Sequence, residues 1–88
     1  MSGPQDIAIV IGVGPDQGLG AQLCRRFAGH GLHVVPVGRT AAKVEAVAAS
    51  ITESGGASTA MTADITQEAD LCRVFAEAGG LGRISLVI

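Results

Sequence analysis

The sequence has little that would bind nucleic acid or a membrane. It contains two phenylalanines and no tryptophan or tyrosine, so it lacks aromatic platforms on which bases stack. Its six lysine and arginine residues form no cluster and the formal net charge is −2, which disfavours nucleic acid and anionic membranes as partners. No apolar run approaches the ~20 residues of a membrane span, and the polar segment 1–6 shows no signal-peptide pattern. We therefore expect a cytoplasmic protein that binds neither nucleic acid nor membrane.

Cysteine is also scarce. Cys24 and Cys72 both fall on apolar stripes of expected helices, where a free cysteine packs as a small hydrophobe. The fold expected below places these helices on opposite faces of one sheet, beyond the roughly 7 Å that a disulfide can bridge. A zinc site formed by Cys24, His30 and His33 would lack a fourth ligand and any recognised spacing. We therefore assign no metal-binding residue.

Small apolar residues and glycine are abundant. Hydrophobic residues make up 48% of the sequence and charged residues 16%, which describes a globular interior and not a disordered tail. The 88 residues suffice for one domain or part of one, near the small end of what buries a useful core.

A glycine-rich turn between an apolar run and a helical pattern is the most informative local feature. The stretch 7–20 reads IAIVIGVGPDQGLG. Strand, tight loop and helix start, in that order, are what a phosphate-binding βα unit needs. Glycines without a Cβ let backbone N–H groups approach a pyrophosphate, and the first helical turn adds its positive dipole end.

The glycine spacing indicates the kind of loop. No Gly-Lys-Ser/Thr follows, so the Walker pattern fails, and G-x-G-x-x-G fails in both frames. The spacing Gly14-x-x-x-Gly18-x-Gly20 resembles the T-G-x-x-x-G-x-G loop of the short-chain dehydrogenase/reductase superfamily. Val13 departs from that pattern, because the family usually has a threonine there whose hydroxyl braces the turn. Taken alone, the motif has an alternative interpretation as a glycine-rich surface turn.

Strand and helix patterns alternate after the loop, which indicates an α/β fold with right-handed crossovers and a parallel sheet. We expect a Rossmann-type doubly wound sheet, of which residues 1–88 form a single partial NAD(P)-binding domain, the N-terminal half of a non-extended family member. The strand order is expected to be 3-2-1-4, with the loop where the winding reverses. The expected strands cover 7–11, 32–37, 57–63 and 84–88, and three helices lie between them, within 20–28, 41–54 and 67–79.

Some details of these elements can be predicted. Pro36 lacks the N–H that a sheet ladder needs, which is tolerable near the end of the second strand. Thr40 is the natural N-cap of the second helix, and Thr66 can cap the third. The periodicity of the third helix places four residues inward, namely Leu71, Cys72, Phe75 and Ala78.

The end of the second strand would lie beside the adenosine ribose of a dinucleotide. An acidic residue there selects NAD through the 2′-hydroxyl, whereas an arginine accommodates the 2′-phosphate of NADP. The sequence has Gly38 in the acidic position, followed by Arg39, whose guanidinium forms two parallel hydrogen bonds with phosphate. Thr40 can add a hydroxyl contact. A solvated arginine is the alternative, but a cation at a helix N-terminus is disfavoured by the dipole unless a bound phosphate compensates.

NADP is therefore favoured over NAD. Asp16 and Gln17 oppose this preference, since relatives that prefer NADP often carry a basic residue in this part of the loop, and Asp16 would repel phosphate unless it turns to solvent.

The segment Asp64-Ile65-Thr66 resembles the Asp-hydrophobic pair that follows the third strand in the family. The resemblance implies that Asp64 accepts a hydrogen bond from the adenine amino group and that Ile65 packs on the ring. An aspartate in an ordinary strand-to-helix turn is the alternative. The candidate cofactor-binding residues are thus Gly14, Gln17, Gly18, Leu19, Gly20, Arg39, Thr40, Asp64 and Ile65.

The catalytic groups of the family are not found in the sequence. In the family, an Asn-Ala-Gly segment, a serine and a Tyr-x-x-x-Lys pair follow the fourth strand, and the tyrosine exchanges a proton with the substrate oxygen. The sequence has no tyrosine and stops at Ile88, so we assign no catalytic residue. The resemblance implies a homo-oligomeric oxidoreductase that transfers a hydride between nicotinamide and a small-molecule carbonyl or secondary alcohol. A non-catalytic nucleotide-binding module or sensor, and a degenerate fold that binds nothing, are the alternatives.

Overall fold

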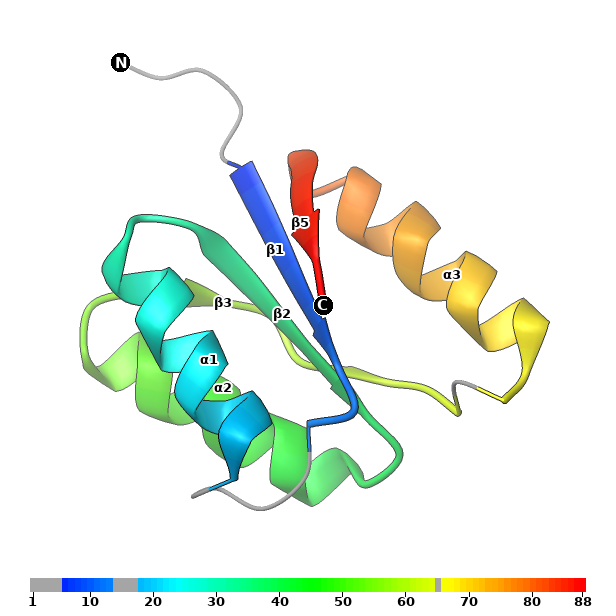
Figure 1. Ribbon diagram of the computed structural model, residues 1–88, viewed down its shortest axis with the longest axis horizontal. Coiled ribbons are helices and arrows are strands. Elements are labelled where there is room, and N and C mark those ends of the chain that lie inside the picture. The colour runs from blue at the N-terminus through cyan, green and yellow to red at the C-terminus, as the bar shows by residue number, and fades with distance from the viewer. Residues whose placement is uncertain (1–5, 14–17, 65) are drawn as a thin grey trace.

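Strands and helices alternate along the chain in the order expected from the sequence (Figure 1). The computed structural model describes residues 6–13, 18–64 and 66–88. The strands are β1 (Asp6–Ile11), β2 (His33–Gly38), β3 (Ala57–Ser58), β4 (Met61–Thr62) and β5 (Arg83–Val87), and the helices are α1 (Leu19–Gly29), α2 (Ala41–Glu53) and α3 (Glu68–Gly79).

The sheet is parallel, with the order β3-β2-β1-β5 and with β4 also paired to β2. This confirms the expected order 3-2-1-4, since β3 and β4 together form the third expected strand and β5 is the fourth. Ile7 lies opposite His33 and Ile11 lies opposite Val37. The carboxyl ends of β1 and β2 therefore finish almost level, at the sheet edge where the glycine-rich loop leaves β1.

A proline explains why the third strand is split in two. The N–H of Thr59 donates to the carbonyl of Val34 at 3.0 Å, and in a parallel ladder the next bond would run from the N–H of residue 36 back to the carbonyl of Thr59. Residue 36 is a fully buried proline without an N–H. Pairing with β2 therefore stops after Ser58 and resumes at Met61.

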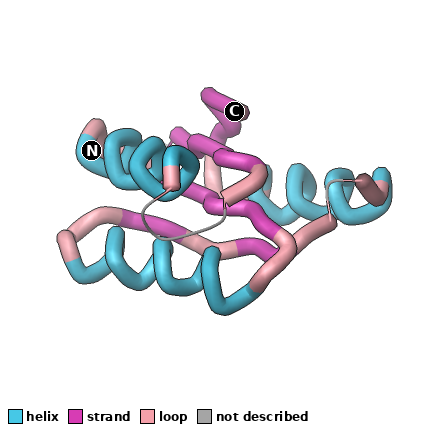
Figure 2. Tube along the Cα trace, turned by 60° about the horizontal axis from the view of Figure 1, so that its bottom comes forward, coloured by secondary structure: helices cyan, strands magenta, loops and turns pink. Residues whose placement is uncertain are grey.

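Helices cover both faces of the sheet, so the central strands are apolar on both sides. In Figure 2, α1 and α2 lie at the left and α3 at the right, with strands between them. Helices α1 and α2 pack on the face that carries Val10 and Val34. Helix α3 packs on the opposite face, which carries Ile9 and Val35. Within the described ranges, no helix is long and apolar enough to span a membrane.

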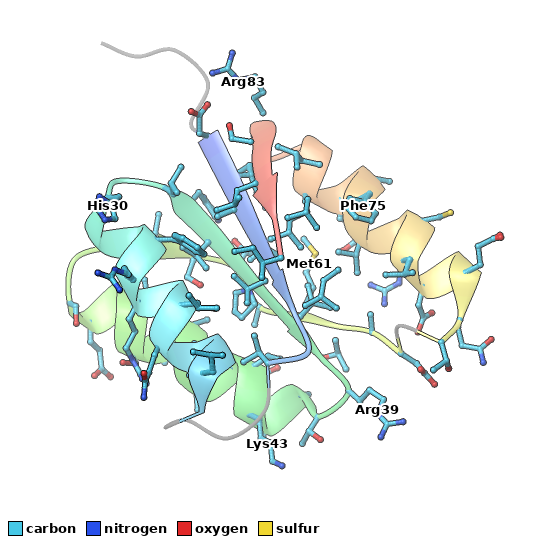
Figure 3. All side chains as sticks on the ribbon, in the orientation of Figure 1. His30, Arg39, Lys43, Met61, Phe75 and Arg83 are labelled. Carbon is cyan, nitrogen blue, oxygen red and sulfur yellow. The ribbon has the colours of Figure 1, made fainter. Side chains whose placement is uncertain are left out.

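The inward face of α3 differs from the expected one. Val74 and Ala78 are fully buried and Leu71 is partly buried, whereas Cys72 and Phe75 are exposed. The buried stripe therefore follows the spacing i, i+3, i+7 from Leu71, and Phe75, at i+4, lies on its flank (Figure 3). The prediction that Cys72 and Phe75 face the core is wrong for this reason.

Cys24, by contrast, is the packing residue that the sequence predicts. It is fully buried in α1, and this burial raises the pKa of its thiol to about 11. Both Cys24 and Cys72 are free thiols, on helices that cover opposite faces of the sheet. A thiol that stays protonated at neutral pH is a poor nucleophile, so Cys24 contributes to the core and not to chemistry.

Candidate functional site at the carboxyl edge of the sheet

The backbone after β1 turns sharply and stays bonded to β2. Gly12 has a φ of +83°, in the left-handed region that favours glycine. The N–H groups of Gly12 and Val13 both donate to the carbonyl oxygen of Val37, at 2.8 and 2.9 Å. This turn therefore requires Gly12, which the glycine spacing did not single out. The sequence signal that points to it is a glycine placed directly after the apolar run.

Helix α1 begins at the same edge. Gly18 is its N-cap, in extended backbone and without a side-chain cap, and the Gly18 carbonyl accepts the first helical bond from Gln22 at 3.1 Å. A Cβ on Gly20 would lie 3.3 Å from the Cα of Val13, so this glycine allows α1 to pack closely on the turn. The N–H groups of the first turn lack intrahelical partners and form the positive end of the helix dipole.

The remaining candidate residues near the cofactor loop include only one that the structure describes. This residue, Leu19, is 72% exposed at the start of α1. Gly14 and Gln17 lie outside the described residues, as does Ile65, so their predicted contacts with a cofactor stay predictions.

A cavity of about 440 Å³ lies next to the turn, within the range of about 300–1,000 Å³ that is typical of ligand sites. The end of β2 and the start of α2 contribute to its wall, and so does the segment that follows β4. Three of the predicted cofactor residues, Arg39, Thr40 and Asp64, meet at this cavity. The lining residues are Gly12, Val13, Gly38, Arg39, Thr40, Lys43, Ala63, Asp64 and Thr66.

Gly38 allows the backbone of β2 to lie directly against the turn after β1. A Cβ added to Gly38 would overlap the carbonyl oxygen of Val13 and would lie 3.0 Å from Cγ1 of Val44. The residue is buried, so a side chain has no open space to enter. The position that would carry an acidic residue in an NAD-selective site is therefore closed by backbone in this chain.

Two exposed cations and a hydroxyl surround the start of α2. Thr40 is the N-cap, as predicted, but its side chain forms no cap bond, which leaves the hydroxyl available to a ligand. Arg39 directly precedes it and Lys43 lies in the first helical turn. Figure 3 shows both cations at the end of the molecule where β1 and β2 finish, opposite the end that carries Arg83. Lys43 was not among the predicted residues, although the helix dipole disfavours a cation there for the same reason that argued against a merely solvated Arg39.

The carboxylate of Asp64 is organised by the residues that follow it. Its Oδ1 accepts a bond from the backbone N–H of Thr66 at 2.9 Å and another from the Thr66 hydroxyl at 2.6 Å. These bonds hold the pKa of Asp64 below its ordinary value, with a smaller contribution in the same direction from the Arg39 charge. Asp64 is therefore a carboxylate at neutral pH, able to accept a hydrogen bond from a ligand.

The prediction that Thr66 caps α3 is wrong, because its hydroxyl is engaged by Asp64. The N-cap is Gln67, one residue later. Asp70, in the first turn of α3, instead accepts the backbone N–H of Asp64 at 2.9 Å. This bond ties the Asp64 segment to the start of the helix.

Replacing Thr66 by valine should raise the pKa of Asp64 toward the ordinary value of an aspartate, since the shorter of the two bonds to Oδ1 is lost. Stabilisation from a depressed pKa is present above the unfolded value and is lost as the pH falls through the folded value. Thr66→Val should therefore be less stable than the wild type above about pH 4, and this difference in stability should disappear at lower pH. An NMR titration of the side-chain carboxyl carbons measures this. Thr62→Val, on β4, is the matched control. An unchanged Asp64 pKa in Thr66→Val would contradict the role of the hydroxyl.

The residues considered as zinc ligands have other surroundings. Cys24 is buried in α1, His30 is exposed at the end of that helix, and Nε2 of His33 lies 2.8 Å from the Thr59 hydroxyl in a hydrogen bond. In the part of the chain that the structure describes, no group of three or more histidine, cysteine, aspartate or glutamate side chains could hold a metal ion.

Comparison with known proteins identifies relatives of this arrangement. The sequence model of the family described as short chain dehydrogenase matches residues 7–88. A hydroxysteroid dehydrogenase from Escherichia coli is 30% identical to the chain, and the two structures superpose with a TM-score of 0.86. The match covers 93% of this chain and 34% of that one. No curated protein matches the chain by sequence.

Two further structures share the fold at lower identity. A short-chain dehydrogenase from Rhodopseudomonas palustris is 24% identical, with a TM-score of 0.85, and the match covers 93% of this chain and 38% of that one. A metagenomic short-chain oxidoreductase in complex with NADP is also 24% identical, with a TM-score of 0.82 and coverage of 93% and 37%. The chain therefore spans little more than a third of the length of these proteins.

Proposed function

Because this chain belongs to the short-chain dehydrogenase family, whose members are oxidoreductases, we propose that it binds the adenosine half of NADP(H) in the cavity at the carboxyl edge of β1 and β2. The protein that contains it then transfers a hydride between the nicotinamide and a carbonyl or secondary alcohol of a small-molecule substrate. The observation that carries this proposal is the meeting of Arg39, Thr40 and Asp64 around one cavity beside the glycine turn.

The residues around the cavity fit the parts of this cofactor. The Asp64 carboxylate accepts a hydrogen bond from the adenine amino group, and Ile65 packs on the ring. The guanidinium of Arg39 and the hydroxyl of Thr40 bind the 2′-phosphate. The pyrophosphate approaches the N-terminus of α1 through the loop residues Gly14, Gln17, Gly18, Leu19 and Gly20.

Two features support NADP over NAD. No side chain fits at position 38, so the carboxylate that would accept from a 2′-hydroxyl is missing there. Within residues 6–13, 18–64 and 66–88, no carboxylate forms an ion pair with Arg39, so its charge can serve a phosphate. The metagenomic oxidoreductase with the same fold was determined as an NADP complex.

The Arg39→Ala variant should bind NADPH more weakly by about 1.5–3 kcal/mol and NADH almost unchanged, since the lost bonds are charge-assisted contacts to the 2′-phosphate alone. Parallel titrations of NADPH and NADH against the full-length protein measure both dissociation constants. Arg39→Lys should fall between the wild type and Arg39→Ala, because lysine keeps the charge without the two-pronged geometry. Equal losses for the two cofactors in Arg39→Ala would remove Arg39 from the 2′-phosphate.

A non-catalytic nucleotide-binding module is the second candidate, because these 88 residues contain no tyrosine to exchange a proton with a substrate. The two candidates differ in turnover. The oxidoreductase consumes NADPH in the presence of a carbonyl compound, and its full sequence contains a Tyr-x-x-x-Lys pair. A full-length protein that binds NADPH selectively, has no such pair and consumes none with a panel of aldehydes and ketones is a binding module.

A further inference from the structure

We infer that Lys43 is a second residue that reads the 2′-phosphate, so that cofactor preference rests on a pair of cations around the start of α2 and not on Arg39 alone. This inference rests on the proposed function, because it concerns the same cavity. The general rule for dinucleotide-binding folds assigns Arg39 to the phosphate, with Thr40 beside it, but gives Lys43 no role.

The position of Lys43 is the first argument. Arg39 precedes the Thr40 N-cap, and Lys43 follows that cap by three residues, so the two cations lie on either side of the start of the helix. Both line the cavity, and both are exposed. Figure 3 shows them at the same end of the molecule, below the finish of β2.

The electrostatics of α2 are the second argument. Its first turn contains a lysine and no acidic residue, an arrangement that the helix dipole disfavours. In the described part of the chain, neither Arg39 nor Lys43 forms an ion pair with a carboxylate. The Arg39 charge lowers the pKa of Asp64, which lines the same cavity. The two cations and the helix end carry more positive charge than the one Asp64 carboxylate at the cavity offsets, and a dianionic phosphate would neutralise the excess.

The donors around this point suit a phosphate monoester. Such a group carries about −1.5 to −2 charge at neutral pH and three strong acceptor oxygens. The Arg39 fork, the uncapped Thr40 hydroxyl and the Lys43 ammonium can each take one of them. The N–H groups of Lys43 and Val44 already bond to the Thr40 carbonyl at 3.1 and 3.3 Å, so the helix start is formed before a ligand binds.

Titrations of NADPH and NADH against the full-length protein test the role of Lys43. We expect Lys43→Ala to weaken NADPH binding by about two- to fivefold, the upper part of the range of a solvent-exposed ion pair, and to leave NADH binding almost unchanged. Lys43→Arg should restore most of the NADPH affinity. Arg26→Ala, which removes the same charge from the last turn of α1, is the control and should leave both dissociation constants unchanged.

A footprinting experiment gives a readout that is independent of the variants. Lys43 is the only lysine of the 88 residues, so its acylation by an amine-reactive ester can be followed by mass spectrometry of one peptide. Adenosine 2′,5′-bisphosphate should slow this acylation, and adenosine 5′-monophosphate at equal site occupancy should not. Equal protection by both nucleotides, or protection by neither, would overturn the inference.

The outcomes separate this inference from the proposed function. If the wild type binds neither NADPH nor NADH, the proposed function fails, and the role of Lys43 fails with it. If Arg39→Ala selectively loses NADPH while Lys43→Ala binds both cofactors like the wild type, only the role of Lys43 is overturned. The same holds if Lys43→Ala loses NADPH and NADH equally.

Discussion

The Gly38→Asp variant should lose the binding of both NADPH and NADH and should unfold more easily. It should not gain a preference for NAD over the NADP that we propose as the cofactor. Introducing an acidic residue at this position is the change that the general rule for dinucleotide folds suggests for NAD selectivity. In this chain the new Cβ overlaps the carbonyl oxygen of Val13 and presses on Val44. Overpacking and an unpaired buried carboxylate together should lower the free energy of unfolding by about 3 kcal/mol or more.

Denaturant unfolding of the full-length protein and titration of both cofactors measure these effects. Gly38→Ala separates the Cβ overlap from the buried charge and should still be destabilised. Gly29→Ala is the matched control, because a Cβ on Gly29 near the end of α1 meets no atom within 4 Å. If Gly38→Asp is as stable as the wild type and gains affinity for NADH, the backbone does not close position 38 and our explanation of the cofactor preference is wrong.

The Gly18→Val variant should lose at least two orders of magnitude in affinity for either cofactor. Gly18 is the N-cap of α1 at φ −77° and ψ 171°, a backbone conformation that valine can adopt. The fold should therefore tolerate the change, at about 1 kcal/mol for the poorer cap. In the proposed site, the valine side chain would stand where the pyrophosphate approaches the first-turn N–H groups, and NADPH and NADH share this pyrophosphate.

Comparing binding with stability makes this result specific. Gly79→Val, at the last residue of α3, is the control, since a Cβ there meets no atom within 4 Å. Gly18→Val should resemble this control in thermal unfolding and differ from it only in cofactor titrations. An unaltered dissociation constant for NADPH in Gly18→Val would refute the assignment of the loop.

The order and type of the main elements could be predicted because local signals agreed with the global fold. Strands β1 and β2 are apolar on every buried position, and such runs between glycine-rich turns are typical of a parallel sheet covered on both faces. The strand order could be predicted because right-handed crossovers and the doubly wound fold imply it, and this order places the glycine loop where the winding reverses.

Two predictions about α3 were wrong because neighbouring residues in the sequence offered similar signals. Val74 and Phe75 both lie about one turn after Leu71, and their apolarity does not show which one faces the sheet. Thr66 and Gln67 are adjacent candidates for one cap, and the tertiary bond from Thr66 to Asp64 decides between them.

Residue type was enough to predict some members of the site but not others. Arg39, Thr40 and Asp64 follow strand ends, and parallel strands bring their carboxyl ends to one edge, so their meeting could be predicted. The closure of position 38 could not, because it depends on the distance between two backbone segments. Ala63 lines the cavity through its place after β4 and carries no chemical signal in the sequence.

The shared acceptor at Val37 has a consequence for how cofactor preference can change. Its carbonyl oxygen accepts the N–H groups of both Gly12 and Val13, so two hydrogen bonds join the turn after β1 to the strand end that precedes Arg39. Substitutions that reshape either segment should therefore be felt at the other. Exchanging the cofactor of this protein would require redesigning residues 12–13 and 38–43 as a single unit.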